Sequence, residues 1–182
     1  MATTKHTLVA LVDDNPGVLN RVASLFRRRG FNIDSITVGQ SETPGISRMT
    51  IVVDGTNTSV EQVRKQLDKL IETVRVTDIT GDNIVVRELA LFKVKTTSSN
   101  RSEVIQIVDI FRANIVDVGL ESLTLEVTGD EDKMSSLYNL LRGFGIKEVA
   151  RTGRIALTRG GAGPVLEEKE VKPERAGKKP KS

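Results

Sequence analysis

Residues 8–37 read LVALVDDNPGVLNRVASLFRRRGFNIDSIT, and this stretch predicts a strand, a polar turn, a helix and a second strand. The apolar run 8–12 has the length of a strand, and it ends where short polar residues meet a proline and a glycine. We expect Asn15 to be the helix N-cap and Pro16 the first helical residue, because the first turn does not need proline's missing N–H. We expect Gly30 to end the helix. The apolar face should consist of Val18, Leu19, Val22, Ala23, Leu25 and Phe26.

The start of this predicted helix suits a small anion. Backbone N–H groups of a first helical turn lack intrahelical partners, and the helix dipole favours negative charge there, so a carboxylate would be stabilised. Asp13 and Asp14 could instead ligate a cation through oxygen. Two adjacent carboxylates lack the spacing of a known cation loop, so a role in the turn is favoured and no metal site is expected.

The next segments complete a β-α-β-β-α-β order. The alternation of the second strand slips after Ile33, which indicates a bulge. A third strand follows a turn, and Thr58 and Glu61 have the spacing of a capping box before a second helix. A fourth strand begins with Val74. Residues 5–80 therefore have the order of a ferredoxin-like domain.

The same order returns in residues 84–159, with a helix opened by Asn100 and a closing strand around the turn at Thr152 and Gly153. The two halves share this pattern but no residue-level identity. The predicted fold class is therefore α+β, with two ferredoxin-like βαββαβ domains, 5–80 and 84–159, followed by a disordered charged tail, 160–182.

Composition excludes several kinds of site. The 182 residues include no cysteine and one histidine, His6, so disulfides, cysteine nucleophiles and cysteine- or histidine-based metal clusters are excluded. The acidic residues are scattered, without a serine–histidine or paired-carboxylate arrangement, and no catalytic residue is expected. We see no signal segment and no run long enough to span a membrane. A cytoplasmic protein without membrane attachment is therefore expected.

Nucleic acid is not an expected partner. The tail from Gly160 carries six Lys or Arg and four Glu, two of the three net positive charges, so the remainder is nearly neutral. A common RNA-binding module shares the predicted topology, but it stacks bases on aromatic residues of its central strands, and LVALV and MTIVV contain none. The run 27–29 of three arginines could bind phosphate, but a favourable interaction of these cations with the dipole at the helix C-terminus is the commoner explanation.

Five separated blocks carry a family resemblance. They read NPGVLNRVASLFRRRGFNIDSITVG, SRMTIVV, QLDKLIETVRVTDI, VRELALFKVK and EVARTGRIAL, and they extend from about Thr7 to Arg159. In this order they resemble the small, regulatory subunit of acetolactate synthase (acetohydroxyacid synthase), whose N-terminal part is an ACT domain. The first predicted domain is accordingly identified as an ACT domain, and the second as the C-terminal, ACT-like domain of such a subunit.

The resemblance implies a protein without catalytic activity of its own. Such a subunit associates with a separate catalytic subunit, raises its activity, and confers feedback inhibition by valine or another branched-chain amino acid, leucine or isoleucine, in branched-chain amino acid biosynthesis. No cofactor is expected in this chain, because thiamine diphosphate, Mg and FAD belong to the catalytic subunit. The resemblance also implies a homodimer in which two ACT domains pair side by side.

The resemblance further implies an effector site between two ACT domains. It places Asp14, Asn15, Gly17 and Val18 at the helix start that receives the amino acid, and Asn32, in the motif GFN, at the dimer interface. An amide suits that position because it both donates and accepts hydrogen bonds. The alternative for Asn32 is an ordinary exposed residue at the edge of a strand.

Position 14 departs from the family pattern. Many relatives have asparagine where this chain has Asp14, and an ionised carboxylate cannot donate a hydrogen bond and would repel the effector's carboxylate. It could attract the effector's ammonium instead, so the choice among branched-chain amino acids stays open. The sequence also leaves open which surface meets the catalytic subunit; the RELALFKV strand and the EVARTG turn are candidates. A transcription regulator would need a DNA-reading helix, and none is appended.

Overall fold

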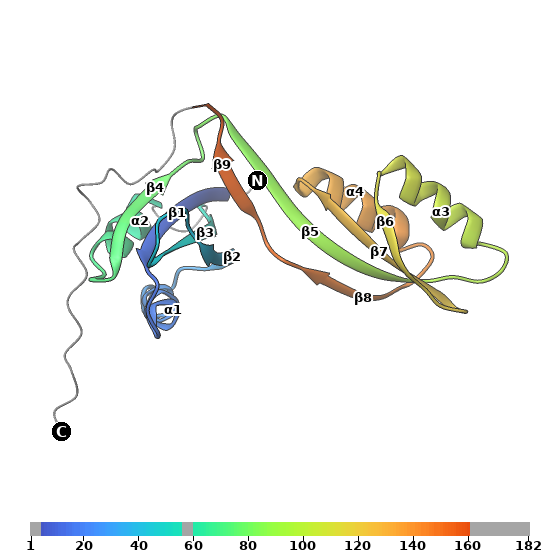
Figure 1. Cartoon of the computed structure of the whole chain (residues 1–182), viewed down its shortest axis with the longest axis horizontal. Coiled ribbons are helices and arrows are strands. Elements are labelled where there is room, and N and C mark those ends of the chain that lie inside the picture. The colour runs from blue at the N-terminus through green and yellow to red at the C-terminus, as the bar shows by residue number, and fades with distance from the viewer. Residues whose placement is uncertain (1–4, 56–59, 161–182) are drawn as a thin grey trace, which may run out of the picture.

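Each half of the chain forms an antiparallel sheet with helices on one face (Figure 1). The structure is a computed structural model that describes residues 5–55 and 60–160. It confirms the α+β class and the βαββαβ order in both halves. The N-terminal domain runs β1 (Lys5–Asp13), α1 (Val18–Arg29), β2 (Ile33–Gln40), β3 (Ile46–Asp54), α2 (Val60–Asp68) and β4 (Thr73–Asp78).

The N-terminal sheet has the strand order β2-β3-β1-β4, so β1 is central and β2 and β4 are edges. Because β1 is buried on both faces, its residues 7–12 are apolar or small and lack the alternation of a half-exposed strand. One face packs under the helices through Leu8, Ala10 and Val12, together with Val22 and Phe26 of α1.

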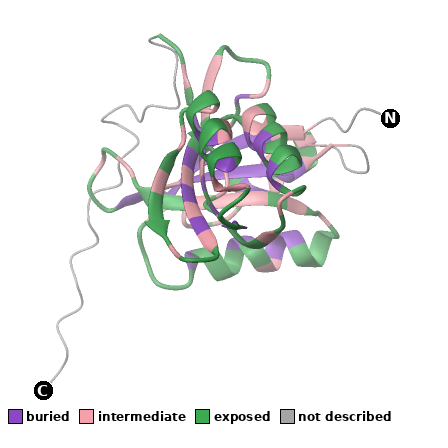
Figure 2. Cartoon of the chain, turned by 90° about the vertical axis from the view of Figure 1, so that its right-hand side faces the viewer, coloured by how far each residue is buried: buried purple, intermediate pink, exposed green. Residues whose placement is uncertain are grey.

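The C-terminal domain repeats this topology. Its elements are β5 (Ile84–Lys95), α3 (Arg101–Ile110), β6 (Asn114–Val118), β7 (Ser122–Gly129), α4 (Glu131–Leu141), β8 (Ile146–Arg151) and β9 (Ile155–Thr158). The strand order β6-β7-β5-β8 corresponds to that of the first domain, and Phe92, Val94 and Leu137 are among its buried residues. Buried residues lie on one side of the helices and exposed residues on the other (Figure 2).

The long strand β5 joins the two domains. Ile84 to Arg87 pair with β9, and Glu88 to Lys95 pair with β7. The closing strand predicted around Thr152 and Gly153 is thus divided into β8 and β9, which pair with different parts of β5. A small apolar cluster of both domains forms here, because the second face of β1 packs against β9. Its members are Val9, Ile79 and Ala156, with Ile84 and Val86 against them.

The first helix begins later than the sequence predicts. Asn15 and Pro16 lie in a turn, and α1 begins at Val18 with Gly17 as its N-cap, so the predicted cap and first residue are wrong. The physical reason is the backbone of Gly17, whose φ of 90° lies in the left-handed region and cannot belong to the helix. The predicted end is confirmed, because Gly30 has φ 67° and donates its N–H to Arg27 and Phe26 carbonyls.

Other local predictions have mixed outcomes. The bulge after Ile33 is confirmed by a register shift between β2 and β3. Leu19 and Ala23 do not join the core, and the Leu19 side chain is 49% exposed, since the buried stripe of α1 is narrower than predicted. The predicted capping residue Thr58 lies outside the described residues, as does the tail after Gly160. Among the described helices, none is long and apolar enough to cross a membrane.

Candidate functional site

The loop between β1 and α1 is exposed and held at its base. The Asp14 N–H donates to the Gly45 carbonyl at 2.8 Å, and the Ser47 hydroxyl donates to Asp14 Oδ1 at 3.1 Å. Both partners flank the start of β3, so the neighbouring strand fixes the loop. Asp14, Asn15 and Gly17 are exposed, whereas Val18 is buried under the helix. These four predicted site residues therefore lie together at one end of the domain.

At the N-terminus of α1, the Val18 N–H makes only a long hydrogen bond, 3.4 Å, to the Asn15 carbonyl. Gly17 supplies no side-chain cap, and the first turn of this fully described helix contains no acidic residue. An added Cβ at Gly17 would meet no atom within 4 Å, so glycine is required by the backbone conformation and not by space. A helix start without a capping carboxylate keeps its positive dipole end available for an external anion.

A charged pair borders this loop. Arg21 of α1 donates to the Glu72 carboxylate, and the backbone carbonyl of Glu72 accepts from the Asp13 N–H at 2.8 Å. The connection from α2 to β4 is thereby fixed beside the loop.

Asn32 lies at the opposite end of the same domain. It is exposed and directly precedes β2, where Ile33 pairs with Val53 and Val53 pairs with His6 at the beginning of β1. Asp13, at the end of β1, pairs with Ile46 at the other end of the sheet. One copy of the chain therefore does not bring Asn32 to the α1 start.

The residues that sequence reasoning missed form a polar junction between the two domains. Lys5 contacts Asp34 at 3.0 Å and Glu131 at 2.6 Å, and Arg154 also pairs with Glu131. They border a cavity of about 400 Å³. No local signal could have revealed them, because the contacts join residues of separate elements, and Lys5 and Glu131 are 126 positions apart in the sequence.

Ion pairing shifts the protonation equilibria of the junction. The hydrogen bond from Lys5 is the main reason why the pKa of Glu131 is lowered, against the opposing effect of burial. The hydrogen bond to Glu131 likewise raises the pKa of Lys5. The Arg151 guanidinium donates two hydrogen bonds to the buried Glu88 carboxylate, from Nε to Oε1 at 2.5 Å and from Nη2 to Oε2 at 2.7 Å. These bonds raise the pKa of Arg151. These charges neutralise one another.

Neither site has the groups of a metal centre. The part of the chain that the structure describes contains no cluster of three or more His, Cys, Asp or Glu side chains able to hold a metal ion. The α1 start offers backbone donors and one carboxylate, which suits a small zwitterion better than a cation. Together with the paired ferredoxin-like domains, this arrangement is that of a regulatory protein with an ACT domain.

Comparison with known proteins specifies the family. Residues 8–75 match the AHAS small subunit-like ACT domain, and residues 87–160 match the small subunit of acetolactate synthase. The chain belongs to the acetolactate synthase small-subunit family. It is 56% identical over 156 residues to the probable acetolactate synthase small subunit of Archaeoglobus fulgidus, covering 86% of this chain and 98% of that one.

Other relatives agree with this assignment. The acetolactate synthase small subunit of Mycobacterium bovis is 50% identical over 163 residues, which cover 90% of this chain and 97% of that protein. The crystal structure of the small subunit from Thermotoga maritima superposes with a TM-score of 0.79 at 44% identity, covering 87% of this chain and 99% of that chain. The predicted family is therefore confirmed, and membership supports a regulatory role.

Proposed function

We propose that this chain is the regulatory subunit of an acetolactate synthase, raising the activity of a separate catalytic subunit and conferring feedback inhibition by a branched-chain amino acid. Family membership across both domains carries this proposal, because identities of 50–56% extend over at least 86% of the chain. The catalytic subunit supplies the carboligation chemistry and its thiamine diphosphate, Mg and FAD. The chain then acts in the cytoplasm without a cofactor of its own.

The proposed effector site is the open start of α1. The backbone N–H groups around Gly17 and Val18 receive the carboxylate of the amino acid. The first turn of α1 contains no acidic residue, and the carboxylate replaces the long bond of 3.4 Å from the Val18 N–H to the Asn15 carbonyl. The loop residues Asp14 and Asn15 form the rim of the site. Its support from β3 through Gly45 and Ser47 means that the N–H groups are held in place before the ligand arrives.

Asp14 receives the ammonium of the same ligand in this proposal. Its carboxylate accepts from the Ser47 hydroxyl, and an ionised carboxylate can accept several hydrogen bonds at once. The helix start and the neighbouring aspartate thus recognise both charges of a zwitterion: the helix N-terminus binds its carboxylate and the Asp14 side chain binds its ammonium.

A second copy of the chain completes the site. Asn32 is too far along the sheet to serve the α1 start of its own chain, and it directly precedes the edge strand β2. Side-by-side pairing of two ACT domains through their edges brings Asn32 of one copy to the α1 start of the other. Residues 5–80 are then the effector-binding dimer, and residues 84–159 make the contact with the catalytic subunit.

Reconstitution tests the proposed function. The chain is mixed with the catalytic subunit from the same source, and acetolactate formation is measured with and without valine, leucine or isoleucine. We expect a higher rate on mixing and a lower rate when one of the three amino acids is added. Titration calorimetry of the chain alone identifies which of them binds. Rates that do not change in any mixture would contradict the proposal.

A further inference from the structure

The connection between β8 and β9, residues Thr152–Arg154, is docked against β2 of the other domain. We name these three residues the coupling turn. The Thr37 hydroxyl donates to the Arg154 carbonyl at 2.8 Å, and the Arg154 N–H donates to the Ser35 hydroxyl at 3.0 Å. Two side chains of β2 therefore satisfy both backbone polar groups of a single residue.

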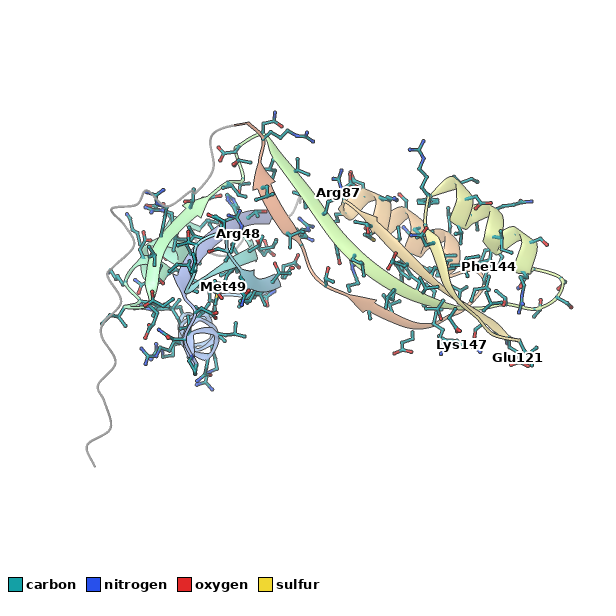
Figure 3. The ribbon with its side chains drawn as sticks, viewed as in Figure 1. Arg48, Met49, Arg87, Glu121, Phe144 and Lys147 are labelled. Carbon is teal, nitrogen blue, oxygen red and sulfur yellow. The ribbon has the colours of Figure 1, made fainter. Side chains whose placement is uncertain are left out.

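Charges reinforce the docking. Glu131, at the start of α4, bridges Lys5 of β1 and Arg154 of the coupling turn, while Lys5 also contacts Asp34 of β2. The signs alternate along this chain of contacts, so each charge has an opposite neighbour. Farther along the boundary, Arg48 of β3 donates to the Ala156 carbonyl of β9 at 2.9 Å; Figure 3 labels Arg48 in the N-terminal domain.

Gly153 makes this close approach possible. Its φ is +84°, and an added Cβ would lie 2.6 Å from Ser35 Oγ and 3.3 Å from Thr37 Cγ2. The first distance is shorter than real Cβ contacts allow, so a side chain at position 153 requires either the turn to move or the Ser35 hydroxyl to rotate away, and both changes break the hydrogen bond from the Arg154 N–H to Ser35. Only glycine fits both the conformation and the space.

The docked turn joins the two halves of the proposed regulatory path. β2 begins immediately after Asn32, and Asp34, Ser35 and Thr37 of the same strand form the contact. On the other side, β8 and β9 are both hydrogen-bonded to β5, the central strand of the C-terminal domain. One turn thus connects β2 with the central strand of the C-terminal domain.

We propose that docking of the coupling turn on β2 transmits effector occupancy from the N-terminal domain to the C-terminal domain. This inference rests on the proposed function. In this proposal the turn has a docked arrangement, which the structure shows, and a released one in which the two hydrogen bonds to Arg154 are broken. The effector alters the catalytic rate by favouring one of the two, and a chain fixed in either arrangement cannot respond.

Gly153→Ala provides the decisive variant. Its methyl group collides with the Ser35 hydroxyl and crowds Thr37, which disrupts the docking contact without entering either hydrophobic core. Gly145→Ala is the matched control, because Gly145 also has a positive φ, +96°, in the same domain, but an added Cβ there makes only an ordinary contact with Lys95 at 3.7 Å. Both variants carry similar backbone strain, and they differ in whether the turn can dock.

A second pair of variants tests the contact by removal. Ser35→Ala with Thr37→Val deletes the two hydroxyls that hold Arg154 and adds no bulk. Ser122→Ala with Thr124→Val is the matched control on β7, a strand of the C-terminal sheet. This pair keeps the test informative if Gly153→Ala fails to fold.

The measurement is the ratio of acetolactate formation rates with and without saturating effector, for each variant reconstituted with the catalytic subunit. We expect both docking variants to activate the catalytic subunit and to bind effector in calorimetry, but their ratio should move to one. Both controls should keep the wild-type ratio. A wild-type ratio in Gly153→Ala or in the hydroxyl double variant would overturn the coupling alone. A ratio of one in the wild-type protein would instead overturn the proposed function, and the coupling with it.

Discussion

The two domains share one topology, but the starts of their first helices differ. In the N-terminal domain the loop before α1 ends in Gly17, with no side-chain cap and no acid in the first helical turn. In the C-terminal domain the corresponding loop before α3 ends in Asn100, and Glu103 lies in the first turn. The dipole end of α3 already has a carboxylate of its own, whereas that of α1 does not.

The loop before α3 is also closed by its own side chains. Asn100 Oδ1 accepts from the Thr97 N–H at 2.7 Å, and the Thr97 and Ser99 hydroxyls are 2.9 Å apart. The Arg101 guanidinium donates to the carbonyls of Gly119 and Leu120 at 2.7 and 2.6 Å. The strand-to-helix junction is therefore closed by its own side chains in the C-terminal domain, whereas in the N-terminal domain it is the proposed effector site. Topology alone does not distinguish the two.

The largest effect is expected from Gly17→Ala. A non-glycine residue at this φ costs about 1–2 kcal/mol of stability, and the loop that carries the binding N–H groups would reorient to relieve the strain. We therefore expect the effector Kd, measured by calorimetry, to rise about tenfold or more, which corresponds to about 1.4 kcal/mol of lost binding. The start of α1 should then bind the effector poorly, as we expect of the closed start of α3.

Gly30→Ala is the control for that result. Gly30 also has a positive φ, 67°, and open space around it, but it ends α1 where Gly17 begins it. A similar loss of stability with an unchanged effector Kd is expected. Equal losses of affinity in both variants would show that the effector responds to the stability of α1 and not to its N-terminus.

Asp14→Asn should weaken the binding of the effector. A hydrogen bond involving a charged group contributes about 1.5–3 kcal/mol, so replacing the carboxylate that faces the ammonium should raise Kd about tenfold. Asp13→Asn, one residue earlier, is the control and should leave Kd unchanged. Tighter binding by Asp14→Asn would mean that the effector's carboxylate lies beside position 14, which reverses the proposed orientation of the ligand.

Asn100→Ala should affect only stability. It removes the hydrogen bond that closes the loop before α3, at a cost of about 1 kcal/mol in the free energy of unfolding measured with urea. Asn139→Ala, on the exposed side of α4, should change that free energy by less than about 0.5 kcal/mol. An effector Kd altered by Asn100→Ala would place the second domain in the binding site and remove the contrast between the two loops.

Sequence reasoning succeeded where local patterns determine structure. Short apolar runs, alternating apolar residues and apolar residues at helical spacing are enough to predict both βαββαβ units, and Gly30 ends α1 as predicted. It failed at the start of α1, because in the Asn-Pro-Gly sequence either Asn15 or Gly17 can be the N-cap, and only the φ of Gly17 decides between them. It also counted Leu19 as core, since periodicity specifies a helical face but not how much of that face the neighbouring sheet covers.

The junction between the domains was beyond prediction from a single sequence. Lys5, Asp34, Glu131 and Arg154 are ordinary charged residues in separate elements, and only the packing of β9 against the N-terminal sheet brings them together. Gly153 gave a signal as part of a turn, but its close approach to β2 depends on the arrangement of the two domains. The proposed interface between two ACT domains also cannot be read from the sequence pattern of one chain, so the role of Asn32 at that interface remains a prediction.

The smallest effect is expected at this junction and depends on pH. The pKa of Glu131 is lowered below 4.5 in the folded protein, mainly by the Lys5 hydrogen bond, so the contribution of this carboxylate to stability is complete above pH 4.5. It is lost as the pH falls through the lowered pKa. Because the Glu131 side chain is 41% exposed, solvent screening limits this contribution to about 1 kcal/mol or less.

The difference in unfolding free energy between the wild-type protein and Glu131→Gln isolates the contribution of the Glu131 carboxylate to stability. Glu61, whose pKa is lowered to about 2 by Arg64, also makes stability fall with acid, but it is present in both proteins and cancels. We expect a constant difference at neutral pH that shrinks below pH 4.5. At the alkaline end the pKa of Lys5 in the folded protein is raised above 10.5, so the difference should also shrink as the pH rises through this raised pKa.

Asp132→Asn, also in the first turn of α4, controls for the helix dipole. If its difference from the wild type has the same size and pH profile, Glu131 acts on α4 alone. A pH-dependent difference confined to Glu131→Gln would assign the stabilisation to contact between the domains, where the coupling turn docks.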